Sequence, residues 1–179
     1  MFSIIWKVIK EMFEKPAISI PSIKPIPAVN NREAFLTVIA VSEGTERIGD
    51  RGYNALFGGG IFDSYADHPR REFNVPRFGI TTSAAGRYQI EAKTFDAYKE
   101  RLKLPDFSPA SQDAIAIELI TERHAILDVD AGRVGSAVMK CSNIWASFQG
   151  NNYHQPTTPL GVLVAAFNKA GGKISVTMI

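Results

Sequence analysis

The sequence has few cysteines, few histidines and little net charge, and each shortage excludes a class of protein. Cys141 is the single cysteine in 179 residues, which excludes an internal disulfide framework and a cysteine-rich zinc site, so folding needs no oxidising compartment. The three histidines, His68, His124 and His154, are never at the i,i+4 spacing of a metal-binding helix. We therefore expect neither a metal nor a cofactor.

The charge is almost balanced over the whole chain. Twenty lysines and arginines against 18 acidic residues give a net charge of +2, without the dense basic stripe of a protein that follows nucleic-acid phosphates. We expect no nucleic-acid partner. Residues 1–28 contain four lysines and two glutamates, which accounts for the whole positive excess.

The chain also lacks a long apolar run at its start. The uncharged stretch Met1 to Trp6 is too short for the core of a signal peptide and far too short to span a bilayer. No small-residue cleavage site follows it. The sequence therefore predicts no secretory signal and no membrane span in this segment.

Residues 1–15 instead have the pattern of an amphipathic helix. The apolar positions at helical spacing are Phe2, Ile5, Ile9, Met12 and Phe13. Such a helix either docks on the rest of the protein or lies on an anionic membrane surface or a partner, which Trp6 and the lysines would suit. Four prolines between residues 16 and 27 predict an extended linker. We place a domain boundary near Ala28, with residues 1–28 as a leader and residues 29–179 as the main domain.

The main domain is predicted to be mostly helical, with one small β-lobe. Asn30 and Glu33 have the spacing of a capping box, and Gly44 ends the apolar pattern that follows. Glycines, prolines and short apolar runs over residues 51–80 predict a small irregular sheet with hairpin turns. Further helices are predicted over residues 90–102, 108–127, 134–145 and 158–170, and a short strand over residues 173–179. The predicted fold class is α+β.

Glu43 is the first candidate for chemistry, because it lies at the C-terminal end of the first predicted helix of the domain, beside Gly44. The helix dipole disfavours a negative charge there. If the β-lobe also desolvates the carboxyl, its pKa rises and it can stay protonated near neutral pH, as a general acid requires. The alternative from position alone is an ordinary surface glutamate.

A second candidate is the segment of small and hydroxyl residues from Thr81 to Ala85, followed by Gly86-Arg87-Tyr88-Gln89. Small residues allow a ligand to approach the backbone. A tyrosine ring can pack on the apolar face of a pyranose, and a glutamine amide can both donate to and accept from sugar hydroxyls. An ordinary turn followed by a helix cap is the alternative.

Two other groups of polar residues are predicted to be structural. The segment Phe62–Arg70 contains Asp67, His68 and Arg70, which we expect to hold a loop together by hydrogen bonds rather than to bind a metal. Cys141 falls on an apolar helix face and is expected in the core, not as a nucleophile.

Seven short motifs together resemble a known family. They are Ser42–Thr45, Gly52–Asn54, Phe57–Gly59, Phe62–Arg70, Ala85–Gln89, Asp106–Ala114 and Cys141–Ser147. In this order and spacing they resemble the lambda-type bacteriophage endolysins over roughly residues 30 to 172. The resemblance implies a lysozyme-like α+β fold. It also implies a lytic transglycosylase that cleaves the β-1,4 bond between N-acetylmuramic acid and N-acetylglucosamine in peptidoglycan.

The resemblance assigns the catalytic role to Glu43. In this family one carboxyl first protonates the glycosidic oxygen and then removes the proton from the C6 hydroxyl of muramic acid, which gives a 1,6-anhydro sugar. The alternative is a hydrolytic muramidase, which needs a second carboxylate about 5 Å or about 6.5 to 9.5 Å away. Asp63, Asp67 and Glu46 are the candidates for that second group.

The resemblance also implies that Tyr53, Ser83, Tyr88 and Gln89 line a saccharide groove, with Tyr153 as a lid or wall residue. Asn54 stands where the lambda-type pattern has aspartate, so that position carries no charge here. A non-catalytic peptidoglycan-binding module is a further alternative, although the acid of the Ser-Glu-Gly-Thr motif is present.

The expected setting is host lysis at the end of a phage infection. The resemblance implies synthesis in the host cytoplasm and action on the periplasmic cell wall after a separate protein has permeabilised the membrane. The expected partners are peptidoglycan glycan strands, with membrane-surface contact through residues 1–15 as a further expectation, and the expected state is a monomer.

Overall fold

The computed structural model describes residues 30–150 and 156–175. The leader over residues 1–28, the domain boundary near Ala28 and the groove residue Tyr153 lie outside the described residues, so these expectations stay predictions. Within the described ranges, no helix is both long enough and apolar enough to cross a membrane.

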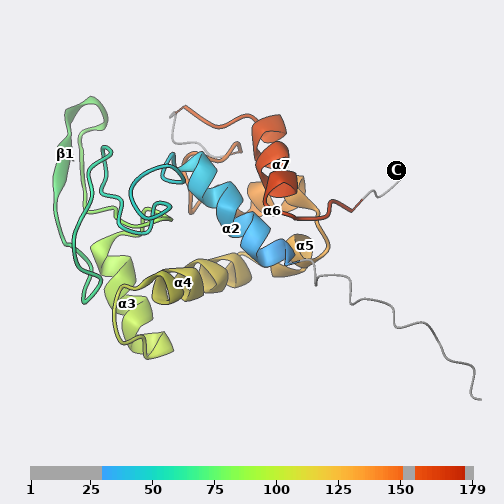
Figure 1. Cartoon of the computed structure of the whole chain (residues 1–179). Helices are drawn as coiled ribbons and strands as arrows, with labels where there is room; N and C mark the ends of the chain where they lie inside the picture. The colour runs from blue at the N-terminus through green and yellow to red at the C-terminus, as the bar shows by residue number, and fades with distance from the viewer. Residues whose placement is uncertain (1–29, 151–155, 176–179) are drawn as a thin grey trace, which may run out of the picture.

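Helix α2, Asn31–Ser42, runs through the middle of the structure (Figure 1). The side-chain oxygen of Asn30 accepts a hydrogen bond of 3.2 Å from the backbone N–H of Glu33, which confirms the predicted cap. The buried face of the helix consists of Ala34, Phe35, Leu36, Val38, Ile39 and Ala40. Gly44 has a φ angle of 73°, a left-handed conformation that costs glycine little, and the helix ends there as predicted.

The other helices of the described ranges follow the β-lobe. They are α3 (Ala92–Leu102), α4 (Pro109–Glu122), α5 (Ile126–Asp130), α6 (Val134–Cys141) and α7 (Leu160–Lys169). The single helix predicted over residues 108–127 is wrong at its end, because α4 stops at Glu122 and a separate helix α5 follows. His124 takes a φ angle of 53°, and this left-handed residue interrupts the helical hydrogen bonds.

Two predictions near the C-terminus also need correction. The helix predicted over residues 134–145 stops at Cys141, and the indole N–H of Trp145 donates instead to the backbone oxygen of Tyr88 at 3.1 Å. The short strand predicted over residues 173–179 is not formed by its described part, residues 173–175. The backbone N–H of Lys173 donates to the side chain of Asn31 at 2.9 Å, so a side chain of α2 takes the place of a partner strand.

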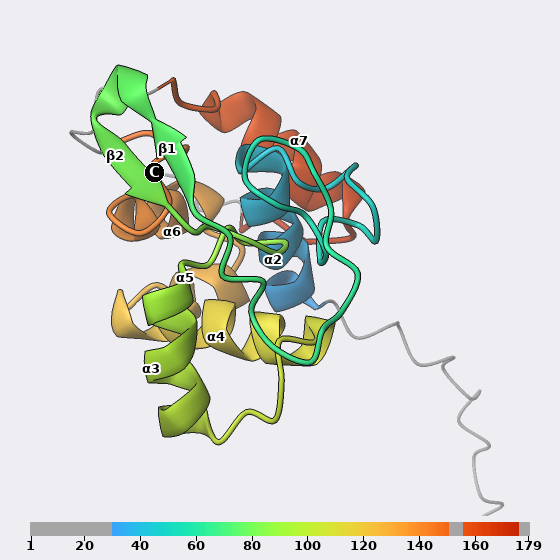
Figure 2. The ribbon, with the colours of Figure 1, turned by 90° about the vertical axis from the view of Figure 1, so that its left-hand side faces the viewer.

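The β-lobe contains a two-stranded antiparallel sheet, β1 (Phe73–Val75) and β2 (Ile80–Thr82), which confirms the predicted small sheet (Figure 2). A short 3₁₀ turn at Pro76–Phe78 joins the strands. Isolated bridges, such as Leu56 with Ala85, tie the long loops of the lobe to its base. The lobe therefore depends on few regular hydrogen bonds.

One apolar core joins the helices to the base of the lobe. Its largest fully buried apolar side chains include Phe35, Phe95, Phe107, Phe148 and Phe167. Helix α2 packs against α7, α5 and α4, while the lobe and α3 lie on the other side of it from α6 and α7 (Figure 1). Cys141 is completely buried, as predicted, and burial raises the pKa of its thiol to about 12, so the thiol is not a nucleophile.

Candidate active site

Glu43 is the C-cap residue of α2, at the end of the helix that passes through the core. Its backbone N–H donates to the carbonyl of Ile39 at 2.8 Å, so the residue still belongs to the last helical turn. The free carbonyls of that turn and the helix dipole both disfavour a negative charge nearby. The end of α2 therefore holds a carboxyl group in a place that favours its neutral form.

The surroundings of the Glu43 carboxyl shift its proton affinity in the same direction. Burial raises its pKa from an ordinary value of 4.5 to about 6, and a hydrogen bond from Ser147 opposes this shift. The hydroxyl of Ser147 donates to Oε1 of Glu43 at 2.5 Å, and the hydroxyl of Ser42 donates to the Ser147 oxygen at 2.8 Å. This chain of two serines fixes the carboxyl and leaves it a proton donor at mildly acidic pH.

Three chain segments are joined beside the end of α2. Thr45 donates its hydroxyl to the carbonyl of Arg87 at 2.6 Å, and Trp145 donates its indole N–H to the carbonyl of Tyr88. These two bonds join the end of α2, the turn at residues 86–90 and the loop after α6. Because Thr45 and Arg87 are buried, the arrangement is part of the core.

The structure corrects the role expected of Tyr88. Only 1% of this residue is exposed, and its phenol donates to Oδ1 of Asp113 at 2.5 Å. A buried ring has no face on which a sugar can stack, so the expected stacking role is wrong. Tyr53 is half-buried and also donates to Oδ1 of Asp113, at 2.9 Å, with its ring edge-on to that of Tyr88. The guanidinium group of Arg87 lies 5.2 Å from the centre of the Tyr53 ring.

Ser83 and Gln89 are partly exposed, and both already make internal hydrogen bonds. The hydroxyl of Ser83 donates to Glu91 at 2.6 Å and accepts from the backbone N–H of Ala92, so it helps to cap α3. The amide of Gln89 donates to the carbonyl of Gly86 at 3.1 Å, which leaves its oxygen and one N–H for a ligand. Their place in a saccharide groove stays a prediction.

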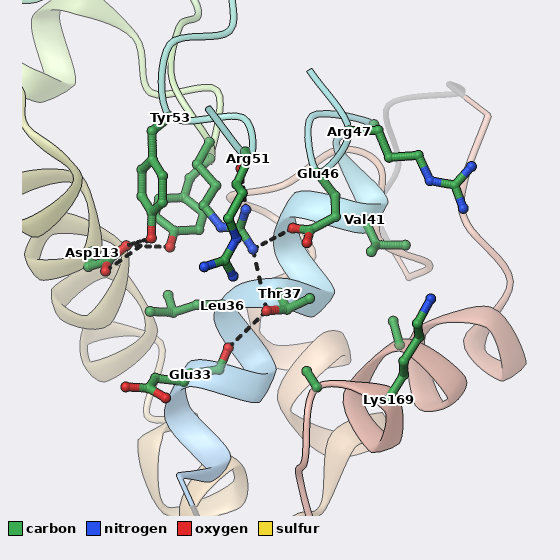
Figure 3. A pocket seen from close by; sticks show the side chains of 15 residues that line it. Glu33, Leu36, Thr37, Val41, Glu46, Arg47, Arg51, Tyr53, Asp113 and Lys169 are labelled. Atoms are coloured by element: carbon green, nitrogen blue, oxygen red, sulfur yellow. Dashed lines mark hydrogen bonds and ion pairs between the residues drawn. The ribbon is translucent and has the colours of Figure 1, made fainter. Parts of the chain in front are cut away.

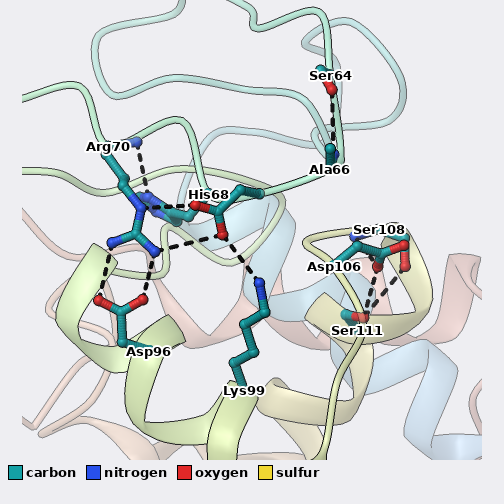
Figure 4. A network of polar contacts seen from close by, with 10 residues as sticks. Ser64, Ala66, His68, Arg70, Asp96, Lys99, Asp106, Ser108 and Ser111 are labelled. Atoms are coloured by element: carbon teal, nitrogen blue, oxygen red, sulfur yellow. Dashed lines mark hydrogen bonds and ion pairs between the residues drawn. The ribbon is translucent and has the colours of Figure 1, made fainter.

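The Phe62–Arg70 segment is a loop network, as predicted (Figure 4). Arg70 forms ion pairs with Asp67 and with Asp96, which belongs to α3. The hydrogen bond from Arg70 to Asp67 lowers the pKa of Asp67 to about 2. His68 is buried, with its Nδ1 accepting from the backbone N–H of Arg70 at 3.0 Å. Its Nε2 must therefore carry the proton and donate to the carbonyl of Ile90 at 2.9 Å.

Two of the candidates for a second catalytic carboxylate form ion pairs, and the third is exposed. Glu46 forms an ion pair with the buried guanidinium of Arg87, and Asp67 is held by Arg70. Asp63 is exposed on the lobe. Asn54, which replaces an expected aspartate, accepts from the backbone N–H of Asp50 at 2.8 Å and so braces its own loop.

Sequence reasoning missed two participants in this site. Ser147 closes the Cys141–Ser147 motif but was given no role, although a serine at the end of a family motif is a signal that could have drawn attention to it. Asp113 lies near the end of the Asp106–Ala114 motif, and burial raises its pKa, while the hydrogen bonds from Tyr88 and Tyr53 oppose this shift. Neither contact follows from spacing along the chain, since Ser147 and Glu43 are 104 residues apart.

Comparison with known proteins identifies close relatives. Residues 33–174 match the family described as Endolysin. The chain is 42% identical over 150 residues to the endolysin of Escherichia phage lambda, an alignment that covers 81% of this chain and 94% of that protein. It is also 42% identical over 164 residues to the endolysin of Escherichia phage P2, covering 82% and 98%.

Solved structures show the same similarity. A structure described as bacteriophage lambda lysozyme complexed with a chitohexasaccharide has a TM-score of 0.78 and 41% identity, covering 83% of this chain and 99% of that one. A second structure of lysozyme from bacteriophage lambda has a TM-score of 0.74 and 40% identity, with the same coverage. The predicted lysozyme-like α+β fold is therefore confirmed.

Proposed function

This chain belongs to the endolysin family, and on that premise we propose that it acts on the β-1,4 bond between N-acetylmuramic acid and N-acetylglucosamine as a lytic transglycosylase. It is a phage endolysin and a peptidoglycan-degrading glycosidase. The observation that carries the mechanistic proposal is the partly buried carboxyl of Glu43 at the end of α2, whose pKa is raised to about 6.

The proposed reaction uses Glu43 twice. Its protonated carboxyl first gives a proton to the glycosidic oxygen, and the bond between that oxygen and the anomeric carbon breaks. The resulting carboxylate then takes the proton of the muramic acid C6 hydroxyl, whose oxygen forms the new bond to the anomeric carbon. The carboxyl ends the cycle protonated again, and no water is consumed.

The hydrogen bond from Ser147 supports this double role. It stabilises the carboxylate that exists between the two proton transfers, because a hydroxyl donor favours the charged form of its acceptor. Burial favours the neutral form at the start of the cycle. A pKa near 6 lies between these opposing demands, so the same group can act as acid and as base.

Two of the three candidates for a second carboxylate, Glu46 and Asp67, are held in ion pairs, which supports transglycosylation over hydrolysis, while the third, Asp63, is exposed on the lobe. A hydrolase needs a free carboxylate as nucleophile or as base for water. Glu46 is neutralised by Arg87, and Asp67 is neutralised by Arg70. Using either group would require breaking an ion pair at the moment of reaction.

Analysis of the sugar products by mass spectrometry tests the proposal. Digested peptidoglycan should yield muropeptides one water lighter than hydrolysis products, and Glu43→Gln should abolish their release while the circular dichroism spectrum is unchanged. Products with an ordinary reducing end would show a hydrolytic muramidase instead. Binding to purified cell walls without any released product would show a non-catalytic module.

We further propose that the protein is made in the host cytoplasm, reaches the periplasmic cell wall after membrane permeabilisation, and acts as a monomer on glycan strands. The leader at residues 1–28 is proposed to assist contact with the membrane surface, because it carries the whole positive excess and an amphipathic pattern. Removing residues 1–28 should then reduce binding to anionic lipid vesicles without reducing activity on purified peptidoglycan. Equal vesicle binding by the truncated and full chains would overturn the membrane role.

A further inference from the structure

A cavity of about 710 Å³ lies beside the candidate active site, between α2, the loop at residues 44–53 and the end of α7 (Figure 3). Its volume is within the range of sites that bind small molecules. Gly44 and Glu46 belong to its wall, but Glu43 does not. The cavity therefore adjoins the end of α2 that carries Glu43.

Several polar side chains of the cavity wall already bond to one another, so they are not available to a charged ligand. Arg87 is buried and paired with Glu46, and it also donates to the hydroxyl of Thr37 at 3.3 Å. The phenols of Tyr53 and Tyr88 both donate to Asp113. These bonds make a rigid polar floor.

Three cations of the wall have no such partners. Within residues 30–150 and 156–175, no carboxylate forms an ion pair with the side chains of Arg47, Arg51 or Lys169. All three residues are exposed, and they come from the loop and from the last turn of α7. Unpaired cations around a concave surface attract an anion more strongly than the same charges on a flat surface.

Negative charge gathers at the other side of the same cavity. Figure 3 shows Glu33 and Asp113 on one side, and Arg47 and Lys169 on the other. The Glu33 carboxylate is exposed and makes no ion pair among the described residues. The cavity presents acidic groups at one side and Arg47 and Lys169 at the other, with Arg51 between them beside Tyr53 (Figure 3), which fits a ligand with both signs of charge rather than a simple anion.

Apolar surface connects the two charged ends. Leu36 and Val41 of α2 and Ala166 and Ala170 at the end of α7 contribute to the wall. Aliphatic parts of a ligand can pack there while its charged groups reach the two ends. A chain made of N-acetylglucosamine alone is neutral and would use neither charged end.

We propose that this cavity binds a short peptide with free carboxylates and a free amine, of the kind attached to muramic acid in peptidoglycan. The identity of the peptide rests on the proposed function, because a peptidoglycan substrate carries such peptides next to the bond that is cleaved. The carboxylates contact Arg47, Arg51 and Lys169, and the amine contacts Glu33. The cavity then distinguishes peptide-bearing strands from bare glycan.

A binding experiment tests the cavity apart from catalysis. The full chain carrying Glu43→Gln, labelled with ¹⁵N, is titrated with a synthetic tetrapeptide that has free carboxylates and a free side-chain amine. The amide signals of Arg51 and Lys169 should shift saturably. Lys169→Gln should weaken binding about tenfold, as expected for the loss of a charge-assisted contact in a partly enclosed site. Lys103→Gln, which removes an exposed lysine at the end of α3, should leave it unchanged.

A separate experiment tests the contact between the peptide amine and Glu33. Acetylating the amine of the peptide should weaken binding to the Glu43→Gln chain several-fold, and it should have no further effect once Glu33→Gln is also present. Absence of saturable shifts, or equal binding by the Lys169→Gln and Lys103→Gln chains, would overturn the proposal. Competition by acetate at the same concentration as the peptide would also overturn it, because that would show a general anion site.

An activity experiment separates this inference from the proposed function. The otherwise unmodified chain should cleave peptide-bearing glycan with a lower KM than peptide-free glycan, and Lys169→Gln should abolish that difference without changing kcat on the peptide-free substrate. If both substrates are cleaved with equal KM, the cavity inference fails and the proposed function stands. If neither is cleaved, the proposed function fails, and the titration alone decides whether the cavity binds the peptide.

Discussion

The hydroxyl of Ser147 lies 2.5 Å from Oε1 of Glu43, and the two residues are 104 positions apart in the chain. This contact joins the end of α2 to the loop after α6. Because the serine donates to the carboxylate form, it opposes the effect of burial on the acid. The balance between these two effects sets the pH range in which Glu43 can give up a proton.

Removing the Ser147 hydroxyl should therefore move the pH profile of the enzyme. In Ser147→Ala the carboxylate loses a donor, so the pKa of Glu43 rises above its value of about 6 and the alkaline limb of kcat/KM moves to higher pH. The rate at the optimum should fall about 10- to 150-fold, because an unmade hydrogen bond to a charged group costs about 1.5 to 3 kcal/mol. Ser147→Thr keeps the hydroxyl and should keep the profile. A lower rate with an unmoved profile would contradict the role of Ser147 in setting the pKa.

Replacing Glu43 should increase stability at neutral pH while abolishing activity. The folded-state pKa, about 6, is higher than the ordinary value of 4.5, so ionisation of the buried carboxyl opposes folding. The favourable contribution of the neutral form is complete below pH 4.5 and is lost as pH rises through 6. Glu43→Gln, which does not titrate, should gain about 2 kcal/mol relative to the parent between these limits.

Urea unfolding at pH 4 and pH 8 measures this gain. The difference between Glu43→Gln and the parent chain should be larger at pH 8. Glu100→Gln, which removes an exposed glutamate of α3, provides the control and should show equal differences at both values. An equal difference for Glu43→Gln would mean that the carboxyl is not desolvated in the folded protein.

Tyr88→Phe distinguishes the observed role of this residue from the one expected from the sequence. The phenol donates to the Asp113 carboxyl and the ring is buried, so the substitution should cost about 1.5 to 3 kcal/mol of stability through one lost hydrogen bond. The KM for glycan should stay within about twofold. Thermal unfolding and steady-state kinetics measure the two effects, and a large rise in KM with unchanged stability would restore the groove role.

The ion pair between Arg87 and Glu46 should contribute strongly to the folded lobe. Arg87→Met leaves the Glu46 carboxylate without its partner and also removes a donor to Thr37, so a loss of about 3 to 5 kcal/mol is expected. Adding Glu46→Gln should recover part of this loss, because no uncompensated charge is then left. Urea unfolding of the two single variants and the double variant gives the coupling energy. Additive losses would show that the pair is not a functional unit.

The main elements of the fold were predictable because their signals are local. Asn30 and Gly44 mark the two ends of α2 through cap chemistry that depends only on neighbouring residues. The break at His124 was not predictable in this way. A left-handed histidine is unusual, and no glycine or proline marks the end of α4, so the packing of α5 on α2 decides where the helix stops.

The same distinction between local and long-range signals applies to the residues of the site. Glu43 could be proposed from its place at a helix end, but the sequence could not show whether the carboxyl is desolvated, because burial depends on residues from distant segments. The same limitation produced the error at Tyr88. An aromatic residue just before a helix is a residue type that can stack on a sugar. Only the tertiary structure shows that the ring of Tyr88 is buried and that its phenol contacts Asp113 instead of a ligand.

The sequence by itself determined the two ends of α2, the glycine-rich lobe, the buried thiol and the acid of the Ser-Glu-Gly-Thr motif, because each depends on residue type and short spacing. The tertiary structure decided the rest. Ser147 donates to Glu43, Asp113 accepts from two phenols, and one cavity is lined by three cations of the loop and α7 that form no ion pair with the described residues. These contacts join residues tens to more than a hundred positions apart, and only the packing of helices around a common core brings such residues together.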